Sequence, residues 1–359
     1  MGAAESRLEI TRLLNGQETE RVLSECTFCF NCNHYCPQNL RPYALIMERA
    51  VERHRGSGKG LPPYVDYLLM GKTERGLFED IYASESAEEQ VILDRWERIP
   101  PKSPEVLFIG CMGREIPSGT EHSSVLGALP KYAPRHACCG ELAYRYGDYQ
   151  TFSETVERTY EMLAGLDTER LVCYCGSCAN YLGNIWPNYH GVKLPFEVVS
   201  VWEWLWEKVR KGEIQVERPI ERKVVLSDSC YGSELGDGFF DAVRGLHEAV
   251  GMTVVELENN RFDNLTCGMV SVIRRDYDLR EGAKETRKKM TQVFNTGVAD
   301  LNCYCPGCYV QLRGAAKKTG IQPHYALEEI LWAFGDDYPV ALEERAAKQT
   351  ELLIKKISA

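Results

Sequence analysis

The spacing of hydrophobic and polar residues changes near position 100. Before that point, apolar residues recur at helical intervals, and this pattern predicts helices within 7–23 and over 42–54, 64–70 and 87–98. Gly56 is expected to end the helix over 42–54. One face of that helix carries apolar side chains at Tyr43, Ile46, Met47, Ala50 and Val51. The first hundred residues are therefore predicted to form a small, mostly helical domain.

Short continuous apolar runs replace the helical spacing after Pro100, Pro101 and Pro104. Runs of this kind are typical of strands that are buried on both faces. A helical pattern follows one of them at 179–185, and the charged tail beyond residue 338 is expected to form a terminal helix. This part of the chain is therefore predicted to have an α/β fold. The runs cover residues 106–110, 171–174, 223–228, 253–257 and 301–304.

The α/β part contains an internal repeat. When 171–182 is aligned with 301–312, leucine, cysteine and tyrosine recur at matching positions. Each copy also has a Cys-Gly pair, at Cys139-Gly140 and Cys267-Gly268. The offset indicates a duplication of about 120 to 130 residues, with the charged stretch 211–222 as the linker. We therefore predict three domains, namely a helical domain over 1–100, a first repeat over 101–218 and a second repeat over 219–359.

Composition and charge narrow the class of protein. The chain of 359 residues has a formal net charge of −10 and no basic tail, which argues against nucleic acid or an anionic membrane surface as a partner. No apolar stretch approaches the length of about 18 residues that spans a bilayer, and the amino terminus lacks the apolar core of a signal peptide. Fifteen cysteines without such a signal indicate metal binding or catalysis rather than disulfides. The sequence predicts a cytoplasmic metalloprotein.

Four cysteines near the amino terminus, here called the N-terminal run, have the spacing C-x2-C-x2-C-x3-C-P. Bacterial ferredoxins use this spacing to hold a [4Fe–4S] cluster. Zinc is the weaker interpretation, because zinc sites usually pair two C-x2-C units at a distance. Either Cys36 closes the cluster of this run or a remote thiolate does, and we favour Cys36. The predicted ligands are Cys26, Cys29, Cys32 and Cys36.

Another group of cysteines lies in the first repeat, beginning with Cys111. The adjacent Cys138 and Cys139 cannot form an unstrained disulfide with each other, but both can face one metal cluster. Gly140, which follows them, allows the backbone to approach closely. A C-x2-C unit, Cys175 to Cys178, begins a predicted helix, whose positive end favours thiolates.

This arrangement resembles the cysteine-rich, or CCG-domain, proteins, which are typified by the catalytic iron–sulfur subunits of heterodisulfide reductase. Related chains serve the oxidation of glycolate, lactate and glycerol-3-phosphate. The resemblance implies two α/β lobes that face each other across a pseudo-two-fold, with clusters near the mouth between them. It also implies that one set of five cysteines holds a noncubane [4Fe–4S] cluster. This first set comprises Cys111, Cys138, Cys139, Cys175 and Cys178.

The chain departs from the family pattern in three respects. The gap from Cys111 to Cys138 is shorter than the family usually shows. The chain has a single ferredoxin-type run where heterodisulfide reductases carry two, and Thr266 replaces the first cysteine of the second CCG pair. Four thiolates suffice for an ordinary cluster or for tetrahedral zinc, and both remain open for the second repeat. Cys303 is a candidate replacement ligand, but Cys173 occupies the same place beside a complete pair, so neither is assigned. The second set comprises Cys230, Cys267, Cys305 and Cys308.

The leading functional interpretation is an iron–sulfur oxidoreductase subunit similar to heterodisulfide reductase. Electrons would pass between a cubane [4Fe–4S] cluster in the N-terminal run and a noncubane cluster in the first set, which would act on a disulfide or thiol substrate. The alternative is a relay subunit of a flavoprotein dehydrogenase or bifurcating complex, without substrate chemistry of its own. A third interpretation makes the second repeat a zinc-bound scaffold. No nucleotide-binding glycine motif follows a predicted strand, so a flavin is expected on a partner subunit, and ferredoxin is a further candidate partner.

Overall fold

The computed structural model describes residues 2–69, 76–337 and 341–358. Among the described part of its first hundred residues, the regular elements are all helices, as predicted. The predicted apolar face of α4 is buried and the helix ends at Gly56, as expected. Residue 70, at the end of a predicted helix, lies outside the described residues. The helices are α1 (Ala3–Leu14), α2 (Val22–Glu25), α3 (Asn31–His34), α4 (Pro42–Gly56), α5 (Pro63–Leu68), α6 (Leu77–Ser84) and α7 (Ala87–Trp96).

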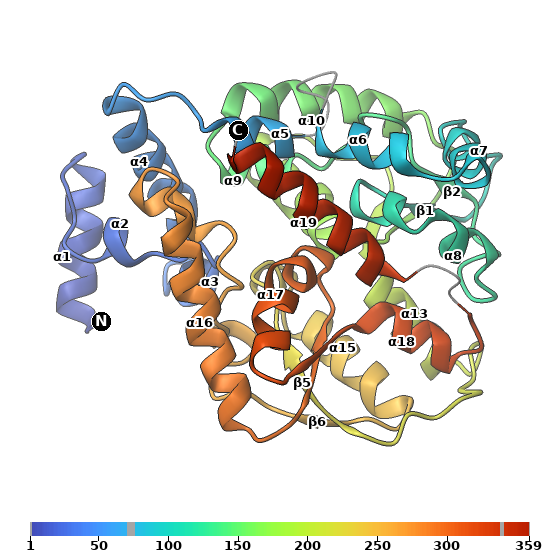
Figure 1. The fold of residues 1–359 in the computed structure, drawn as a ribbon. Coiled ribbons are helices and arrows are strands. Elements are labelled where there is room, and N and C mark those ends of the chain that lie inside the picture. Colours follow the sequence, from blue (N-terminus) through green and yellow to red (C-terminus); the bar gives the residue numbers. More distant parts are fainter. Residues whose placement is uncertain (1, 70–75, 338–340, 359) are drawn as a thin grey trace.

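Two parallel four-stranded sheets follow, one in each repeat, which confirms the α/β prediction (Figure 1). Their strand orders are β2-β1-β3-β4 and β6-β5-β7-β8, so corresponding strands occupy corresponding places. Continuous apolar runs predicted the central strands and the edge strand β6, whereas β2, β4 and β8 were missed. The strands are β1 (Glu105–Phe108), β2 (Lys131–Tyr132), β3 (Arg170–Cys173), β4 (Glu197–Ser200), β5 (Lys223–Ser227), β6 (Thr253–Val255), β7 (Asp300–Cys303) and β8 (Gln322–Tyr325).

Helices cover both sheets. In the first repeat these are η1 (Met112–Glu115), α8 (Pro117–His122), α9 (Glu141–Arg145), α10 (Tyr149–Ala164), α11 (Gly176–Asn180), the π-helix η2 (Tyr181–Ile185), α12 (Trp186–His190) and α13 (Val201–Arg210). In the second they are α14 (Gly232–Leu235), α15 (Asp237–Ala249), η3 (Arg261–Asp263), η4 (Ser271–Arg275), α16 (Leu279–Asn295), α17 (Pro306–Lys318) and α18 (Ala326–Ala333). The predicted terminal helix is α19 (Leu342–Ser358), which packs against α5, α6 and α17 (Figure 1).

Strand register brings the cysteines of each repeat to one edge of its sheet. Phe108 of β1 pairs with Cys173 of β3, and Ser227 of β5 pairs with Cys303 of β7. The chain leaves each of these strands at its carboxyl end and reaches the predicted ligands within a few residues. Parallel strands end at a common edge, where binding sites of α/β folds usually form.

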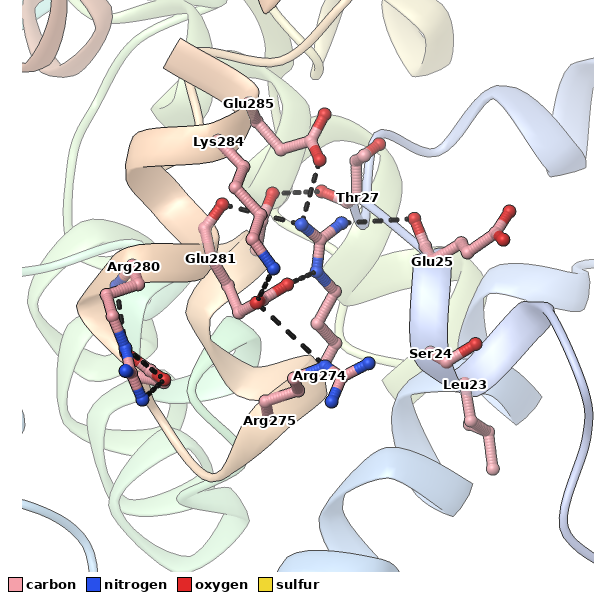
Figure 2. Close-up of polar contacts among 12 residues, drawn as sticks. Leu23, Ser24, Glu25, Thr27, Arg274, Arg275, Arg280, Glu281, Lys284 and Glu285 are labelled. Carbon is pink, nitrogen blue, oxygen red and sulfur yellow. Dashed lines mark hydrogen bonds and ion pairs between the residues drawn. The ribbon is translucent and has the colours of Figure 1, made fainter. Parts of the chain in front are cut away.

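The amino-terminal helices lie beside η4 and α16 of the second repeat (Figure 1). Figure 2 shows the contact that joins them, which centres on the buried guanidinium of Arg274. It forms ion pairs with Glu281 at 2.6 Å and Glu285 at 2.8 Å, and it donates to the carbonyl of Glu25 at 3.2 Å. Because Glu25 immediately precedes Cys26, this buried arginine ties the start of the N-terminal run to the second repeat. No helix within the described ranges is both long and apolar enough to cross a membrane.

Candidate functional site

A cavity of about 420 Å³ lies between the two repeats. Side chains of α5, α6, α17 and the carboxyl-terminal helix α19 complete its walls. Both cysteine sets expected in the repeats line it, so residues separated by up to 197 positions share one space. The cysteines that line the cavity are Cys111, Cys138, Cys139, Cys175, Cys178, Cys230, Cys267, Cys305 and Cys308.

The five cysteines of the first set form a continuous row of sulfur contacts. Hydrogen-bond contacts link Cys111 to Cys138 and Cys138 to Cys139. Further contacts link Cys139 to Cys178 and Cys178 to Cys175. The structure therefore brings together all five thiols that the resemblance grouped.

Two glycines allow the first set to pack this closely. Gly110 has a φ of +62°, and a Cβ there would lie 2.9 Å from the Cys178 sulfur. Gly140 has a φ of +81°, and a Cβ there would lie 2.6 Å from the Phe152 ring. Both positions combine a left-handed backbone with no room for a side chain, so they require glycine.

Contacts between sulfurs separate the pKa values within the first set. The hydrogen bond from Cys111 is the largest cause that lowers the pKa of Cys138, and the same bond raises the pKa of Cys111. The contact with Cys178 likewise lowers the pKa of Cys175. Because several thiolates cannot coexist in a buried space without a cation, some of these thiols must stay protonated and donate hydrogen bonds to their neighbours. A metal centre would replace those protons and bind the sulfurs as thiolates.

The second set has four cysteines instead of five, and fewer contacts link their sulfurs. Cys308 contacts both Cys267 and Cys305, and its hydrogen bond lowers the pKa of Cys267 to about 6. Burial raises the pKa of Cys230 to about 12. Thr266, which stands where the missing cysteine would be, lines the cavity, and its buried hydroxyl has no hydrogen-bond partner among the described residues.

Two cavity residues were not found by sequence reasoning. Arg145 is buried and donates to the Cys230 sulfur at 3.0 Å. Tyr231 is 1% exposed and lies within electrostatic reach of Cys175 and Cys305, one from each set. No local motif marks either residue, because their partners lie far away in the sequence.

The N-terminal run forms a separate loop that does not line this cavity. Burial raises the pKa of Cys26 and of Cys32, and the nearby Cys29 sulfur raises both further. Phe28 and Phe30 have φ values of 56° and 69°, and these turns curl the loop so that both rings are fully buried. Cys36 follows α3, and its role in closing a cluster remains a prediction.

The N-terminal run packs mainly on the second repeat. Asn31 accepts a hydrogen bond from Ser233 at 2.6 Å, and Asn33 donates to Glu234 at 2.7 Å. His34 stacks on Phe262 with ring centroids 3.5 Å apart. His34 is nevertheless exposed to solvent.

Cys173 and Cys303, which the sequence left unassigned, are fully buried at the ends of β3 and β7. Neither is among the residues that line the cavity. Burial raises the pKa of Cys303 to about 12, which opposes a thiolate there. The structure thus separates both from the two sets.

The donor chemistry of both sets fits iron–sulfur clusters. In the described part of the chain, no three His, Cys, Asp or Glu side chains are grouped as a single metal ion requires. The cysteine sulfurs instead surround an open space. Soft thiolates in such an arrangement are the ligands of polynuclear iron–sulfur centres.

Comparison with known proteins identifies the class. The family model of the cysteine-rich domain, CCG, matches residues 106–183 and 224–313. These segments contain the two parallel sheets up to β3 and β7 and both cysteine sets. The chain therefore carries two CCG cysteine-rich domains.

Among characterised proteins, the chain is homologous to one of the subunits of dihydromethanophenazine:CoB–CoM heterodisulfide reductase. It is 24% identical to the Methanosarcina barkeri protein over 86% of this chain and 77% of that one. It is 25% identical to the Methanosarcina mazei protein over 79% and 70%. A probable iron–sulfur-binding oxidoreductase from Bacillus subtilis, FadF, is 23% identical over 83% of this chain but 44% of its own length.

Solved structures add little. A glutamate racemase from Bacillus anthracis aligns with 72% of this chain and 83% of its own, at 13% identity and a TM-score of 0.29. A likeness this weak supports no conclusion about fold or activity.

Proposed function

We propose that this chain is an iron–sulfur oxidoreductase subunit that moves electrons to or from a substrate site between its two CCG domains. The observation that carries the proposal is the continuous row of five cysteine sulfurs in the first set, which faces the second set across one cavity. Homology to the heterodisulfide reductase protein supports the same role. We further propose that residues 1–100, 101–218 and 219–359 act as three domains.

Each set of cysteines has a proposed cofactor. The N-terminal run, Cys26 to Cys36, would hold a cubane [4Fe–4S] cluster, and the first set would hold a noncubane one. For the second set we favour a further iron–sulfur cluster over zinc, because its four thiols border the same open cavity as the first set. Bound clusters would supply one-electron chemistry at the cavity, while the protein supplies ligands, burial and hydrogen bonds to sulfur.

The proposed substrate is a small organic disulfide. Its reduction breaks the S–S bond and consumes two electrons and two protons, giving two thiols. Leu279, Ile354 and Ile357 are partly exposed yet line the cavity, so its mouth is apolar. An uncharged aliphatic disulfide would therefore enter more readily than an anionic one of the same length.

The electrons require a partner. The homologous heterodisulfide reductase protein is, by its name, one part of a larger enzyme, and we propose that this chain likewise works with other subunits, one of which carries a flavin. The four cysteines of the N-terminal run are partly exposed, so a donor can approach them. The same observation favours the second candidate, a relay that passes electrons onward without substrate chemistry.

Metal content and turnover test the proposal together. Protein purified without oxygen should contain about 12 iron atoms, at four per cluster, and show an EPR signal unlike an ordinary cubane. With reduced viologen as the one-electron donor, it should reduce dipropyl disulfide faster than dithiodipropionate, whose chains match in length but end in carboxylates. About 8 iron with one zinc would assign zinc to the second set and leave the rest standing. About 4 iron would overturn the proposal, and full iron without any turnover would favour the relay.

A further inference from the structure

Arg145 lies where the N-terminal run and both repeats meet. It belongs to α9, just after the Cys138-Cys139-Gly140 turn, and its side chain is 2% exposed. One guanidinium nitrogen, Nη1, donates to the Cys230 sulfur at 3.0 Å and to Glu141 at 2.9 Å. The other, Nη2, donates to the carbonyl of Phe28 at 2.8 Å. One planar group therefore contacts the second set and the N-terminal run simultaneously.

The hydrogen bond from Arg145 to the Phe28 carbonyl reaches the N-terminal run itself. Phe28 lies between Cys26 and Cys29, so its peptide belongs to the loop that would surround the first cluster. From that peptide to the Cys230 sulfur, the connection consists of two hydrogen bonds and the guanidinium between them. Within the described residues, no hydrogen bond joins the N-terminal run to a cysteine of the first set.

The charge of Arg145 is also suited to this place. Burying a guanidinium is costly unless it is paired and hydrogen-bonded. Glu141 supplies one carboxylate, and a metal-bound thiolate at Cys230 would supply further negative charge. A hydrogen bond from a cation to a ligand sulfur favours the reduced state of the centre, since that state carries more negative charge.

We infer that Arg145 is a positioning residue that directs electrons from the N-terminal run into the second set, by bridging the Phe28 carbonyl and the Cys230 sulfur. This inference rests on the proposed function, because it requires redox centres at both places. The transfer moves one electron and no atom, so the centre at the N-terminal run is oxidised as the centre at Cys230 is reduced. The second CCG domain, despite its missing cysteine, is then the entry point of electrons into the cavity. The first set receives them afterwards.

The test compares four forms of the cluster-loaded full chain, namely wild type, Arg145→Gln, Arg145→Lys and the control Arg53→Gln. Arg53 also donates to a backbone carbonyl just before the N-terminal run, that of Leu23 at 3.0 Å, and it is partly exposed. Among the described residues, the contacts of Arg53 do not include a cysteine. The control therefore reports any general loosening of the loop. EPR-monitored potentiometric titration measures each centre, and rapid freezing after mixing with reduced viologen measures the order in which they are reduced.

Arg145→Gln should lower the potential of the second-set centre and slow its reduction by about tenfold, with iron content unchanged. Arg145→Lys should lower the potential of the second-set centre by less than Arg145→Gln does, because it keeps the positive charge. It should still slow the reduction of that centre, because a single amine cannot bridge both acceptors. Arg53→Gln should resemble wild type.

An unchanged potential and rate in Arg145→Gln would overturn the inference, and so would an equal effect of Arg53→Gln. If both Arg145 variants fail to fold, the wild-type protein still tests the inference. Reduction of the first-set centre before the second-set centre would overturn it. Zinc in the second set overturns it too, yet leaves the proposed function of the first set intact. Conversely, the expected shifts without disulfide turnover would support the inference and count against the proposed substrate chemistry.

Discussion

The two CCG domains share one architecture and differ in what they offer a metal. Their sheets have corresponding strand orders, and each places a lone cysteine after its first strand and a C-x2-C unit after its third. The first domain then provides five contacting sulfurs, whereas the second has Thr266 in place of one cysteine and a guanidinium on the Cys230 sulfur. The fold has thus been retained while the ligand set has changed.

A second difference between the domains lies two residues before the lone cysteines, Cys111 and Cys230. Strand register aligns Ile109 of the first domain with Asp228 of the second. Ile109 is fully buried in an apolar core, whereas Asp228 is 2% exposed and pairs with Arg244 at 2.8 Å. Asp228 also accepts hydrogen bonds from the Tyr304 hydroxyl and the backbone of Arg261. A buried ionic network therefore holds the loop of the second domain where apolar packing holds that of the first.

The largest expected effect distinguishes the two metal sets. Cys139→Ser should remove the unusual EPR signal, about 4 iron atoms and all disulfide turnover, because Cys139 links the two ends of the sulfur row. Cys267→Ser, its counterpart, should remove a different signal while the first-set signal persists. Iron analysis and EPR of both variants check this. Loss of the same signal in both would mean that one centre spans the cavity, and the comparison would fail.

Replacing Asp228 should reveal the ionic support that is peculiar to the second domain. Asp228→Asn leaves the buried Arg244 with one fewer counter-charge, so the free energy of unfolding should fall by about 3 kcal/mol. Asp241→Asn, which removes a largely exposed partner of Arg261, should cost less than about 1 kcal/mol. Urea denaturation followed by circular dichroism measures both. Equal losses would show that the buried network contributes no more than a surface pair.

The effect of Asp228 should also depend on pH. Burial opposes its ionisation, but the hydrogen bonds and charge of Arg244 outweigh burial and lower its pKa. A lowered folded-state pKa stabilises the protein above the unfolded-state pKa of about 3.9, and this contribution disappears as the pH falls through the folded-state value. The difference in unfolding free energy between wild type and Asp228→Asn should therefore be constant near neutral pH and shrink in acid. A difference that grows in acid would contradict the assigned charge.

The sequence predicted the parts of this structure that depend on short-range pattern. Continuous apolar runs predicted β1, β3, β5, β6 and β7, and the resemblance to the CCG family implied how the cysteines group into two sets. The edge strands β2 and β8 were missed, because one has two residues and the other contains Pro323, which an edge strand tolerates. Arg145 could not be found in this way, since its partners Cys230 and Phe28 lie 85 and 117 positions away. Contacts of that range depend on how the repeats pack.

A smaller effect tests whether Thr266 alone accounts for the difference between the first and second sets. Thr266→Cys restores the adjacent pair, and the hydroxyl it removes has no partner among the described residues, so stability should change by less than about 1 kcal/mol. The EPR signal of the second set should change toward that of the first. The mirror variant Cys138→Thr should change the first-set signal toward that of the second. If Thr266→Cys leaves its signal unaltered, Arg145 on Cys230, and not the missing sulfur, would be what distinguishes the sets.

The smallest effect concerns the two cysteines at the ends of the third strands. Cys303 is a candidate replacement for the missing ligand by sequence position, but it is fully buried, does not line the cavity and lies beside the Ser227 side chain. Its counterpart Cys173 has the same burial next to a complete set. Cys303→Ala and Cys173→Ala should therefore each lower the free energy of unfolding by about 1 kcal/mol through lost packing, with iron content and EPR signals unchanged. Loss of the second-set signal in Cys303→Ala alone would show that this thiol turns toward the cavity to complete the set, so that the two domains would differ less than their sequences do.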